Sequence, residues 1–252
     1  MAKEDNQKRL SFSIIIAAYN EEKYLGQCLE SLLKQNYPGQ FEIIVVDNAS
    51  TDNTKVIASK YSVRILFEPK PGVAYASNLG AEAAQKEILV FTDADAILPA
   101  DWLTNINNNF NIHPQAVAVG GGYIFYDASR LINFLVKYPV IFIYHKFLFS
   151  HWPALPSVNL SITKEAFQKV NGFNPAVLWG EDIEICQRLA KQGPLIFDRE
   201  LLVFTSFRRY RGGYINPLLR SAHIIKESLI QLIRYYRARR AAAEFPAQKP
   251  IR

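Results

Sequence analysis

Residues 89–98 read LVFTDADAIL, an apolar run that ends in two aspartates one residue apart. A short continuous apolar run is typical of a strand that is buried on both faces of a parallel sheet. Asp93 and Asp95 would repel each other at the end of such a strand, where the apolar flank leaves their charges poorly solvated. Because such a pair is usually tolerated beside a positive charge, the stretch predicts a buried strand with a cation at its carboxyl end.

The segments before this stretch have the same character. Strands are expected over 12–18, 41–47, 63–67 and 87–93, and helices over about 20–37, 52–61 and 74–86. We expect Asn20 to cap the first helix, and Ser50 or Thr51 to cap the second. Strands that alternate with helices predict an α/β fold with a mostly parallel central sheet flanked by helices on both faces.

Polar residues end three of these strands, as AYNEE (18–22), DNAS (47–50) and TDAD (92–95). In an open parallel sheet, ligands bind at the carboxyl ends of the strands. Three strands that deliver polar and acidic groups to one edge favour a binding site there over the chance polarity of solvated loops.

The second half of the chain is less regular. A strand is expected over 116–126, with Gly120 to Gly122 permitting a bulge or a close approach, and a helix over 178–193 that Gly180 opens. A long amphipathic helix is expected from Asn216 to about Arg240.

Residues 207–240 hold nine Arg or Lys and one acid, so this region alone makes the net charge of +6 positive. A nearly neutral remainder argues against a surface coated with nucleic-acid contacts.

The chain has 252 residues, of which 49% are hydrophobic, which fits one large domain or two closely fused halves. Cys28 and Cys186 are expected to be buried and unpaired, in keeping with a reducing cytoplasm. The charged N-terminus has no apolar region of the signal-peptide kind. No uninterrupted apolar run of roughly 18 residues predicts a transmembrane span. The most apolar stretch, 131–149, is expected to be a buried or surface-lying amphipathic element.

Oxygen ligands spaced like Asp93 and Asp95 suit Mg²⁺ or Mn²⁺, which would share a phosphate oxygen of the ligand. If the strand geometry persists, both side chains face the same way. The alternative is a polar strand end in which Asp95 caps the next turn. Asp47 and Asn48 are expected to hydrogen-bond a nucleobase or a ribose, while Ser50 caps the following helix.

Glu181 and Asp182 are predicted to lie at a helix N-terminus, where the helix dipole favours carboxylates in any case. The functional interpretation makes one of them a general base that takes a proton from an attacking hydroxyl. Trp179 is expected either to shape a sugar pocket or to pack. Further candidates are phosphate-binding arginines, with a solvated basic face as the alternative, and histidines that would complete a metal site: Arg208, Arg209, Arg211, His145 and His151.

Over about residues 11 to 210, five ordered segments give the chain a resemblance to family 2 glycosyltransferases of the GT-A fold: SIIIAAYNEEKYLGQCLESLLKQ, EIIVVDNASTDNT, GVAYASNLGAEAA, ILVFTDADAILP and VNGFNPAVLWGEDIEICQRL. The ordered set is far more specific than any one motif. The resemblance implies a Rossmann-like sheet and transfer of a sugar from a nucleoside-diphosphate donor, of the UDP or GDP type, with inversion. It implies a nucleotide-sugar-binding half at 11–99 and an acceptor-binding half at 100–215, followed by the basic amphipathic helix and a flexible tail at 216–252.

The same resemblance implies roles for individual residues. The nucleoside would be held by Ala18, Tyr19, Glu21, Asp47 and Asn48. Asp93 and Asp95 would form a DxD motif, with Asp95 as the more direct ligand of the metal. Asp182 would be the base and Glu181 its acceptor-positioning neighbour, and Arg208 is the candidate cation for the donor. A hydroxyl activated by Asp182 would then displace the diphosphate in line and invert the centre.

Three departures from the family pattern stand out. Asn48 occupies a position where many relatives have a second Asp, and Ser77 one where many have Arg, which removes a cation near the donor. Lys70 or Arg208 would substitute for it. The Q-x-x-R-W motif is absent, and SFRRYRGG (206–213) lies in about that region. Its absence predicts a single transfer instead of processive synthesis.

Other functions fit the sequence less well. A sugar-phosphate nucleotidyltransferase would carry a Gly-rich, Arg-bearing loop after the first strand, and a dinucleotide oxidoreductase G-x-G-x-x-G. AAYNEE (17–22) matches neither. The non-enzymatic alternative is a catalytically degenerate protein that binds a membrane surface or nucleic acid through the basic helix. The apolar stripe of that helix favours an anionic membrane surface. We therefore expect a cytoplasmic enzyme, peripheral on the inner face of the membrane, with a lipid-linked or membrane-proximal glycan as acceptor and no nucleic-acid partner.

Overall fold

The computed structural model of the chain describes residues 8–135, 155–177 and 180–208. Contacts divide the chain into two units, Met1–Phe207 and Arg208–Arg252, and the sheet with its helices belongs to the first. Several predictions fall outside the described residues: the helix from Asn216, most of the stretch 131–149, Trp179, His145, His151, Arg209 and Arg211. The division into parts at 11–99, 100–215 and 216–252 stays a prediction.

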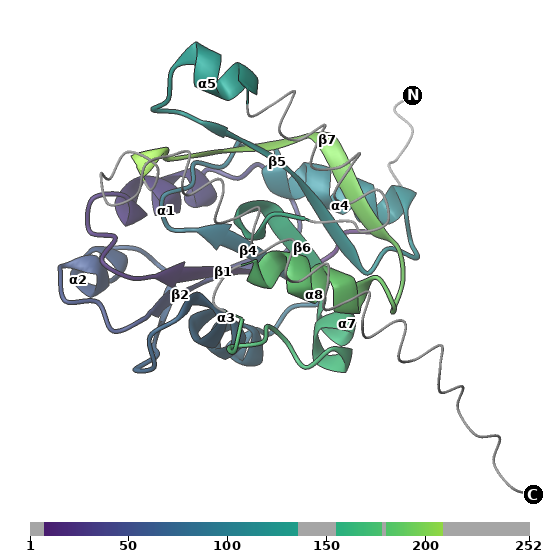
Figure 1. Ribbon diagram of the computed structural model, residues 1–252, viewed down its shortest axis with the longest axis horizontal. Helices are drawn as coiled ribbons and strands as arrows, with labels where there is room; N and C mark the ends of the chain where they lie inside the picture. The colour runs from purple at the N-terminus through teal and green to yellow at the C-terminus, as the bar shows by residue number, and fades with distance from the viewer. Residues whose placement is uncertain (1–7, 136–154, 178–179, 209–252) are drawn as a thin grey trace, which may run out of the picture. The chain divides into compact units, whose positions relative to one another are not determined.

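One seven-stranded sheet runs in the order β3-β2-β1-β4-β6-β5-β7 (Figure 1). Its strands are β1 (Phe12–Ala18), β2 (Phe41–Asp47), β3 (Arg64–Phe67), β4 (Ile88–Asp93), β5 (Ala118–Phe125), β6 (Leu160–Thr163) and β7 (Leu195–Thr205). The first four strands are mutually parallel, β6 is antiparallel to both of its neighbours, and β5 pairs with β7 in parallel. The predicted mostly parallel α/β sheet is confirmed.

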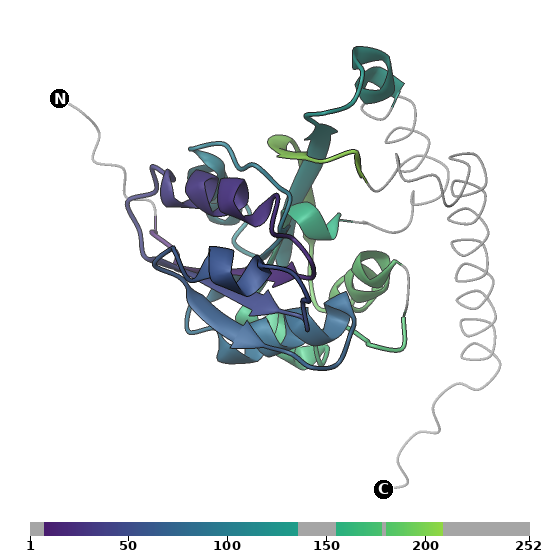
Figure 2. The same ribbon diagram turned by 90° about the vertical axis from the view of Figure 1, so that its left-hand side faces the viewer.

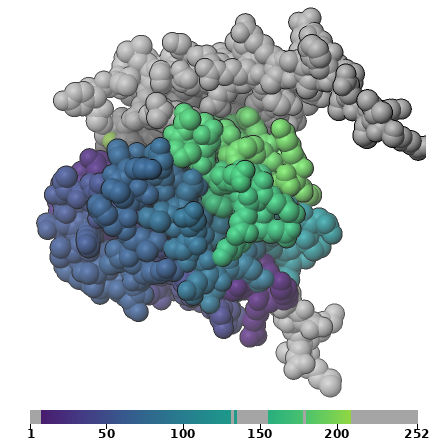
Figure 3. Space-filling model, turned by 90° about the horizontal axis from the view of Figure 1, so that it is seen from below, coloured from purple at the N-terminus to yellow at the C-terminus, as the bar shows by residue number. Residues whose placement is uncertain are grey.

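Helices cover both faces of the sheet. One face carries α1 (Leu25–Leu33), α2 (Thr54–Ala58) and α4 (Trp102–Ile112), and the other α3 (Val73–Ala83), α7 (Lys164–Lys169) and α8 (Glu181–Leu189). Figure 2 shows the layers from the side, with the purple α1 and the blue α3 on opposite sides of the sheet. In Figure 3, the blue N-terminal half adjoins the green segment after residue 155. Two short elements complete the set, α5 (Arg130–Leu135) and the 3₁₀ turn η3 (Ser157–Asn159).

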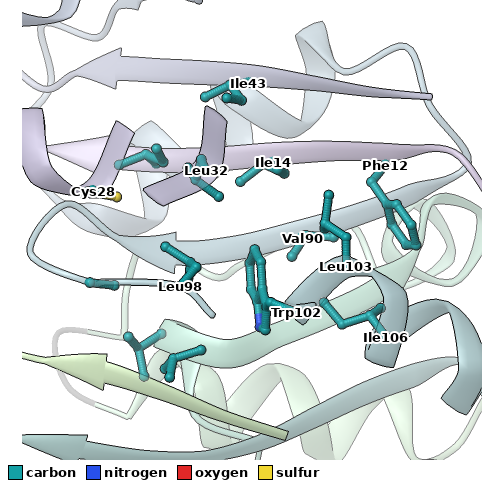
Figure 4. Packing of buried hydrophobic residues seen from close by; sticks show 14 of the residues in the cluster. Phe12, Ile14, Cys28, Leu32, Ile43, Val90, Leu98, Trp102, Leu103 and Ile106 are labelled. Atoms are coloured by element: carbon teal, nitrogen blue, oxygen red, sulfur yellow. The ribbon is translucent and has the colours of Figure 1, made fainter. Parts of the chain in front are cut away.

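Successive residues of β1 face opposite sides of the sheet, which explains why its apolar run is unbroken. Ile14 and Ile16 belong to the cluster under α1, α2 and α4, whereas Ile15 belongs to the cluster under α3, α7 and α8. A strand that is covered on both faces needs apolar side chains at every position. Figure 4 shows the first cluster, with the fully buried Trp102 of α4 at its centre.

The sequence did not predict β6 or β7. With four residues, β6 is too short to show a periodicity, and the charged residues 198–200 interrupt β7. At that point β7 shifts register against β5, so that Gly121 pairs with Asp198 but Gly122 with Leu202. A Cβ on Gly121 would lie 1.8 Å from the carbonyl oxygen of Leu201, so the close approach requires glycine. Of the two alternatives expected at 120–122, the close approach is confirmed at Gly121, while the extra residues of the irregular pairing lie in β7.

The two predicted helix caps do not form. The first helix begins at Leu25, and Asn20 lies in the preceding loop with a φ of 55°. The second begins at Thr54, so Ser50 and Thr51 lie too far upstream to cap it. These polar side chains bond to a neighbouring loop instead, which local sequence patterns do not reveal.

The structure also bears on the predictions for the two cysteines, for Gly180 and for membrane-spanning helices. Cys28 and Cys186 are buried and free, as expected. Gly180 opens α8 as expected, with a φ of 73°, in the left-handed region that favours glycine. Within the described ranges, no helix has the length and apolar character needed to cross a membrane.

Candidate active site

Three strand ends meet at one edge of the sheet. In the pairing of β1 with its neighbours, Ala18 lies opposite Asp47, and Ala17 lies opposite Asp93. Ala18 and Asp47 are buried, and Asp93 is half-buried. The register therefore brings AYNEE, DNAS and TDAD together, as the sequence predicted.

Hydrogen bonds join the loop after β1 to the loop after β2, and we call residues 20–22 and 50–54 the loop latch. Backbone N–H groups of the first loop donate to side chains of the second: Asn20 to Ser50 Oγ at 3.0 Å, Glu21 to Thr54 Oγ1 at 2.7 Å and Glu22 to Asp52 Oδ2 at 3.1 Å. Two backbone N–H groups of the second loop donate the other way: Thr51 to Asn20 Oδ1 at 2.8 Å and Asn53 to Glu22 Oε2 at 3.1 Å. Side chains that resemble helix caps in the sequence thus hold two loops against each other.

Asn48 is buried, and its side chain is bonded to the segment that leads into α3. Its Nδ2 donates to the carbonyl oxygens of Glu68 at 3.0 Å and Lys70 at 2.6 Å. Its Oδ1 accepts a hydrogen bond from the N–H of Gly72 at 2.8 Å. Asn48 therefore shapes the loop before α3, and its contact with a nucleoside stays a prediction.

The other nucleoside-binding candidates differ in exposure. Tyr19 is 57% exposed, whereas Glu21 and Asp47 are 6% and 4% exposed. Asp47 Oδ1 accepts a hydrogen bond from the N–H of Ser50 at 3.1 Å. An exposed aromatic ring near buried carboxylates offers a stacking surface and acceptors, the groups that a nucleobase and a ribose need. The roles of these residues stay predictions.

A pocket that is open to solvent lies between β1, α3, β4, η3 and α8. Its polar lining consists of Ser77, Thr92, Asp93, Ser157 and Glu181, and the rest is aliphatic or aromatic. Among the lining residues that the structure describes, none is basic. The pocket joins a predicted metal ligand to a residue predicted to act on the acceptor.

The two aspartates of the opening stretch do not continue a strand. β4 ends at Asp93 and the chain turns through residues 94 and 95, so the same-face geometry expected of a strand does not apply. Asp93 lines the pocket, whereas Asp95 is 3% exposed and accepts a hydrogen bond from Thr205 Oγ1 at 3.1 Å. Behind the turn, Cys28 Sγ lies 3.6 Å from the carbonyl oxygen of Asp93 and donates to it.

These two carboxylates fit a divalent ion bound together with a phosphate. Mg²⁺ is usually held by one or two carboxylates plus substrate phosphates and water. Within the parts of the chain that the structure describes, no three His, Cys, Asp or Glu side chains are grouped to hold a metal. By their chemistry, two carboxylates suit a metal that is shared with a diphosphate.

The carboxylates of α8 lie in its first turn, as predicted. Asp182 is half-buried, with Oδ1 accepting from the N–H of Ile183 at 2.8 Å and Oδ2 from that of Ser157 at 3.4 Å. Burial raises the pKa of Asp182, these hydrogen bonds offset part of the rise, and the charge of Asp93 adds to it. A carboxyl group with a raised pKa beside a pocket has the properties of a general base.

The position where many relatives have Arg is occupied by Ser77, and the two cations proposed to replace that Arg, Lys70 and Arg208, lie in different parts of the chain. Ser77 is buried and lines the pocket where many relatives have Arg. Lys70 Nζ lies 5.6 Å from the ring centroid of Tyr75. Arg208 belongs to the other unit of the chain, and its role toward the donor stays a prediction.

Sequence reasoning missed three pocket residues, Thr92, Ser157 and Phe173. Thr92 belongs to the TDAD segment but was given no role of its own, and Ser157 lies in a segment without a motif. Phe173 ends the VNGF segment that carries part of the family resemblance, the one available signal. Asn78 holds it there by accepting from its N–H at 2.9 Å and donating to its carbonyl at 2.8 Å.

The architecture of the sheet and its flanking helices is that of the GT-A fold, which solved structures of glycosyltransferases share. A family model described as glycosyl transferase family 2 matches residues 13–170, and one described as the N-terminal domain of galactosyltransferase matches residues 139–205. The chain belongs to glycosyl transferase family 2.

Two relatives illustrate the similarity. The glycosyltransferase GlyG of Streptococcus pneumoniae is 36% identical over 123 residues, which cover 46% of this chain and 40% of the relative. The glycosyltransferase AglE of Haloferax volcanii is 39% identical over 98 residues, which cover 36% of this chain and 32% of the relative. The matched region thus spans less than half of either relative.

Solved structures show the same fold. The mannosyltransferase PcManGT of Pyrobaculum calidifontis, in complex with GDP-Man and Mn²⁺, superimposes with a TM-score of 0.72 at 24% identity, over 90% of this chain and 65% of that one. TarS 1–349 of S. aureus, in complex with UDP-GlcNAc, gives a TM-score of 0.62 at 18% identity, over 82% of this chain and 62% of that one. At these identities the likeness establishes the architecture.

Proposed function

We propose that the chain transfers a sugar from a nucleoside-diphosphate donor to an acceptor hydroxyl, with inversion, in a single displacement. The observation that carries the proposal is the shared pocket, which is lined by Asp93 at the sheet edge and by Glu181 of α8, the residue before Asp182. An in-line displacement needs the leaving group and the incoming hydroxyl on opposite sides of the anomeric carbon. A pocket between a strand end and a helix end provides two such sides.

On the donor side, different residues would bind the nucleoside and the diphosphate. The nucleoside would lie against Tyr19 and Asp47, at the end of the sheet that the loop latch fixes. Asp93 and Asp95 would hold Mg²⁺ or Mn²⁺ on the diphosphate, and the bound ion would supply stabilisation of the charge on the leaving group. PcManGT and TarS, whose complexes contain GDP-Man with Mn²⁺ and UDP-GlcNAc, support this donor class.

On the acceptor side, Asp182 would take the proton of the attacking hydroxyl, and Glu181 would orient the acceptor. The raised pKa of Asp182 suits a base, because proton transfer is most effective when the pKa of the base approaches the working pH. Asp182 must be ionised to act, so the rate should fall as the pH drops through its folded-state pKa.

The acceptor in this proposal is a lipid-linked or membrane-proximal glycan, and the enzyme is cytoplasmic and peripheral to the membrane. The support is the basic segment 207–240, whose arginines suit an anionic surface. Recovery of all of the protein in the soluble fraction at low salt would contradict this part. The same segment favours the second candidate, a degenerate membrane-surface binder, and such a protein would keep its function in Asp182→Asn.

Calorimetric titration tests the donor site. UDP and GDP are each titrated with Mn²⁺, Mg²⁺ or EDTA into wild type, Asp95→Asn and the surface control Glu165→Gln. We expect one diphosphate to bind in a metal-dependent manner to wild type and to the control, and at least tenfold more weakly to Asp95→Asn, because a metal ligand is lost. Binding that is equally strong with EDTA would overturn the metal assignment, and binding of neither diphosphate would overturn the donor class.

A further inference from the structure

The 3₁₀ turn η3 lies between the two sets of carboxylates. Its three residues lead directly into β6, the strand that pairs with β4. Each of the three makes a hydrogen bond to a different part of the fold, and no motif in the sequence marks the turn. The turn contacts Asp182, the proposed base, on one side and β4, which ends in the proposed metal ligand Asp93, on the other.

The first two residues of the turn make the bonds to the site. The N–H of Ser157 donates to Asp182 Oδ2 at 3.4 Å, and the carbonyl oxygen of Val158 accepts from Thr92 Oγ1 at 2.9 Å. Thr92 immediately precedes Asp93 in β4. Two hydrogen bonds through adjacent residues of one turn thus connect the helix that carries the base to the strand that carries the pocket aspartate.

The third residue anchors the turn in the core. Asn159 is fully buried; its Oδ1 accepts from Trp102 Nε1 at 2.9 Å, and its Nδ2 donates to the carbonyl oxygens of Gly122 at 3.1 Å and Leu201 at 2.8 Å. These carbonyls lie where β5 and β7 shift register, so the amide of Asn159 supplies bonds that the ladder there does not. Three bonds in a dry environment leave the turn one orientation, because each would leave a buried polar group unsatisfied if broken.

We propose that η3 positions the base of the reaction, with Asn159 anchoring the turn, Thr92 fixing it to β4, and the N–H of Ser157 holding the Asp182 carboxylate. The inference rests on the proposed function and adds positioning residues to it. These residues touch the base or the strand rather than the reacting atoms. A disturbed turn should therefore lower the rate at saturating donor and leave donor affinity in place, since the loop latch is elsewhere.

A proline tests the bond to the base. Ser157→Pro removes the N–H, and the backbone accepts it because Pro156 already has φ −65° and ψ 136°, as a residue before proline requires. Ser157→Ala keeps the N–H and is the matched control. The titration of the Asp182 carboxyl group is followed by ¹³C NMR in metal-free, aspartate-labelled protein, with Asp182→Asn identifying its signal.

We expect Ser157→Pro to raise the pKa of Asp182 above that of wild type and Ser157→Ala, because a hydrogen bond to the ionised form is lost. The charge of Asp93 in β4 raises the pKa of Asp182, and the charge of Asp182 in turn raises the pKa of Cys186. Glu181 and Glu184 lie in the same helix as Asp182. All of them are the same in both variants. Equal pKa values in Ser157→Pro and Ser157→Ala would overturn the proposed bond.

A second pair of variants tests the bond to β4. Thr92→Val removes the hydroxyl that donates to Val158, and its control Thr104→Val removes an exposed one that donates to Asn36 Oδ1 at 3.4 Å. The measurement is release of nucleoside diphosphate from UDP-glucose, UDP-GlcNAc or GDP-mannose with Mn²⁺. For Thr92→Val we expect about a tenfold lower kcat, with an unchanged KM for the donor. A change in KM alone, or an effect no larger than that of Thr104→Val, would overturn the inference.

The variant Asp182→Asn distinguishes a failure of the proposed mechanism from a failure of the proposed role of η3. If it keeps the wild-type rate, Asp182 is not the base, and the proposed mechanism fails together with the inference. If it is inactive while Ser157→Pro and Thr92→Val behave like their controls, the mechanism stands and only the role of η3 is wrong.

Discussion

The loop latch and the turn η3 hold the two ends of the same site in different ways. The latch joins loops that follow adjacent parallel strands, and five backbone N–H groups take part in it, at distances of 2.7 to 3.1 Å. The turn holds the carboxylate of Asp182, the proposed base, by one longer bond of 3.4 Å and is itself held by the buried Asn159. The proposed donor end is thus held by several parallel bonds, whereas a single bond connects η3 to Asp182, which also accepts from the N–H of Ile183.

This difference has a physical consequence for function. Loss of one bond among several leaves the geometry of the latch nearly intact, so its effect should be a modest loss of donor affinity. Loss of one bond at η3 changes where a reacting carboxylate lies, and small displacements of reacting groups have large effects on rate. Variants at the two ends should therefore differ in which kinetic parameter changes.

The largest effect should come from Asp182→Asn, which removes the base itself. We expect the rate of transfer to fall about 10³-fold, within the range that a general base contributes, while the affinity for UDP or GDP with Mn²⁺ stays at the wild-type value. Steady-state kinetics and calorimetry measure the two quantities. A loss of diphosphate affinity as large as the loss of rate would place Asp182 at the donor end of the site.

The next effect is on stability, in Asn159→Ala. Removal of the amide leaves the Trp102 N–H and two carbonyl oxygens unsatisfied in the core, which should lower the free energy of unfolding by about 3 kcal/mol. Urea denaturation measures it, with Asn111→Ala as the control, since Asn111 is partly exposed on α4. A loss no larger than that of the control would mean that η3 needs no anchor.

A smaller effect is expected for Asp52→Ala in the loop latch. Partial burial favours a higher pKa for Asp52, but hydrogen bonds from Thr54 and Glu22 outweigh it and lower the pKa. Removing this acceptor should cost about 1.5 kcal/mol of stability and weaken diphosphate binding about fivefold, with kcat at saturating donor unchanged.

Asp101→Ala is the control for this variant, because Asp101 is an N-cap without a side-chain capping bond. A fall in kcat with unchanged affinity in Asp52→Ala would reverse the distinction between the two ends of the site.

The smallest effect is a pH dependence of stability. Burial raises the pKa of Asp182 in the folded state, so the native protein binds more protons than the unfolded chain between the two pKa values, and wild type loses stability as the pH rises through that window. Asp182→Asn should therefore gain stability relative to wild type from acid to neutral pH, as measured by urea denaturation across a pH series.

Glu165→Gln should show the opposite sign, because the hydrogen bond and charge of Lys169 lower the pKa of Glu165. The stability due to this carboxylate is present above its unfolded pKa and lost as the pH falls. The prediction fails if the stability difference between Asp182→Asn and wild type does not change with pH.

The sequence predicted the elements that local periodicity encodes. The buried strands β1, β2 and β4, the edge where they end, and the acidic first turn of α8 follow from apolar runs and from the polar residues after them. The misassigned caps show the limit. Ser50 and Thr51 have the chemistry of caps, but their partners lie in the loop after another strand, and a local pattern contains no information about which distant donor is closer.

By itself, the sequence determined the class of fold, the family and the identity of the carboxylates, because these depend on residue type and on spacing within short segments. Tertiary structure alone decided which carboxylates share a pocket, that the chain turns between Asp93 and Asp95, and that Asn48 is bonded to its neighbouring loop. It also placed η3 between Asp182 and β4, through contacts between residues such as Thr92 and Val158 that are far apart along the chain. Such contacts depend on how the layers pack, and packing is a property of the whole chain.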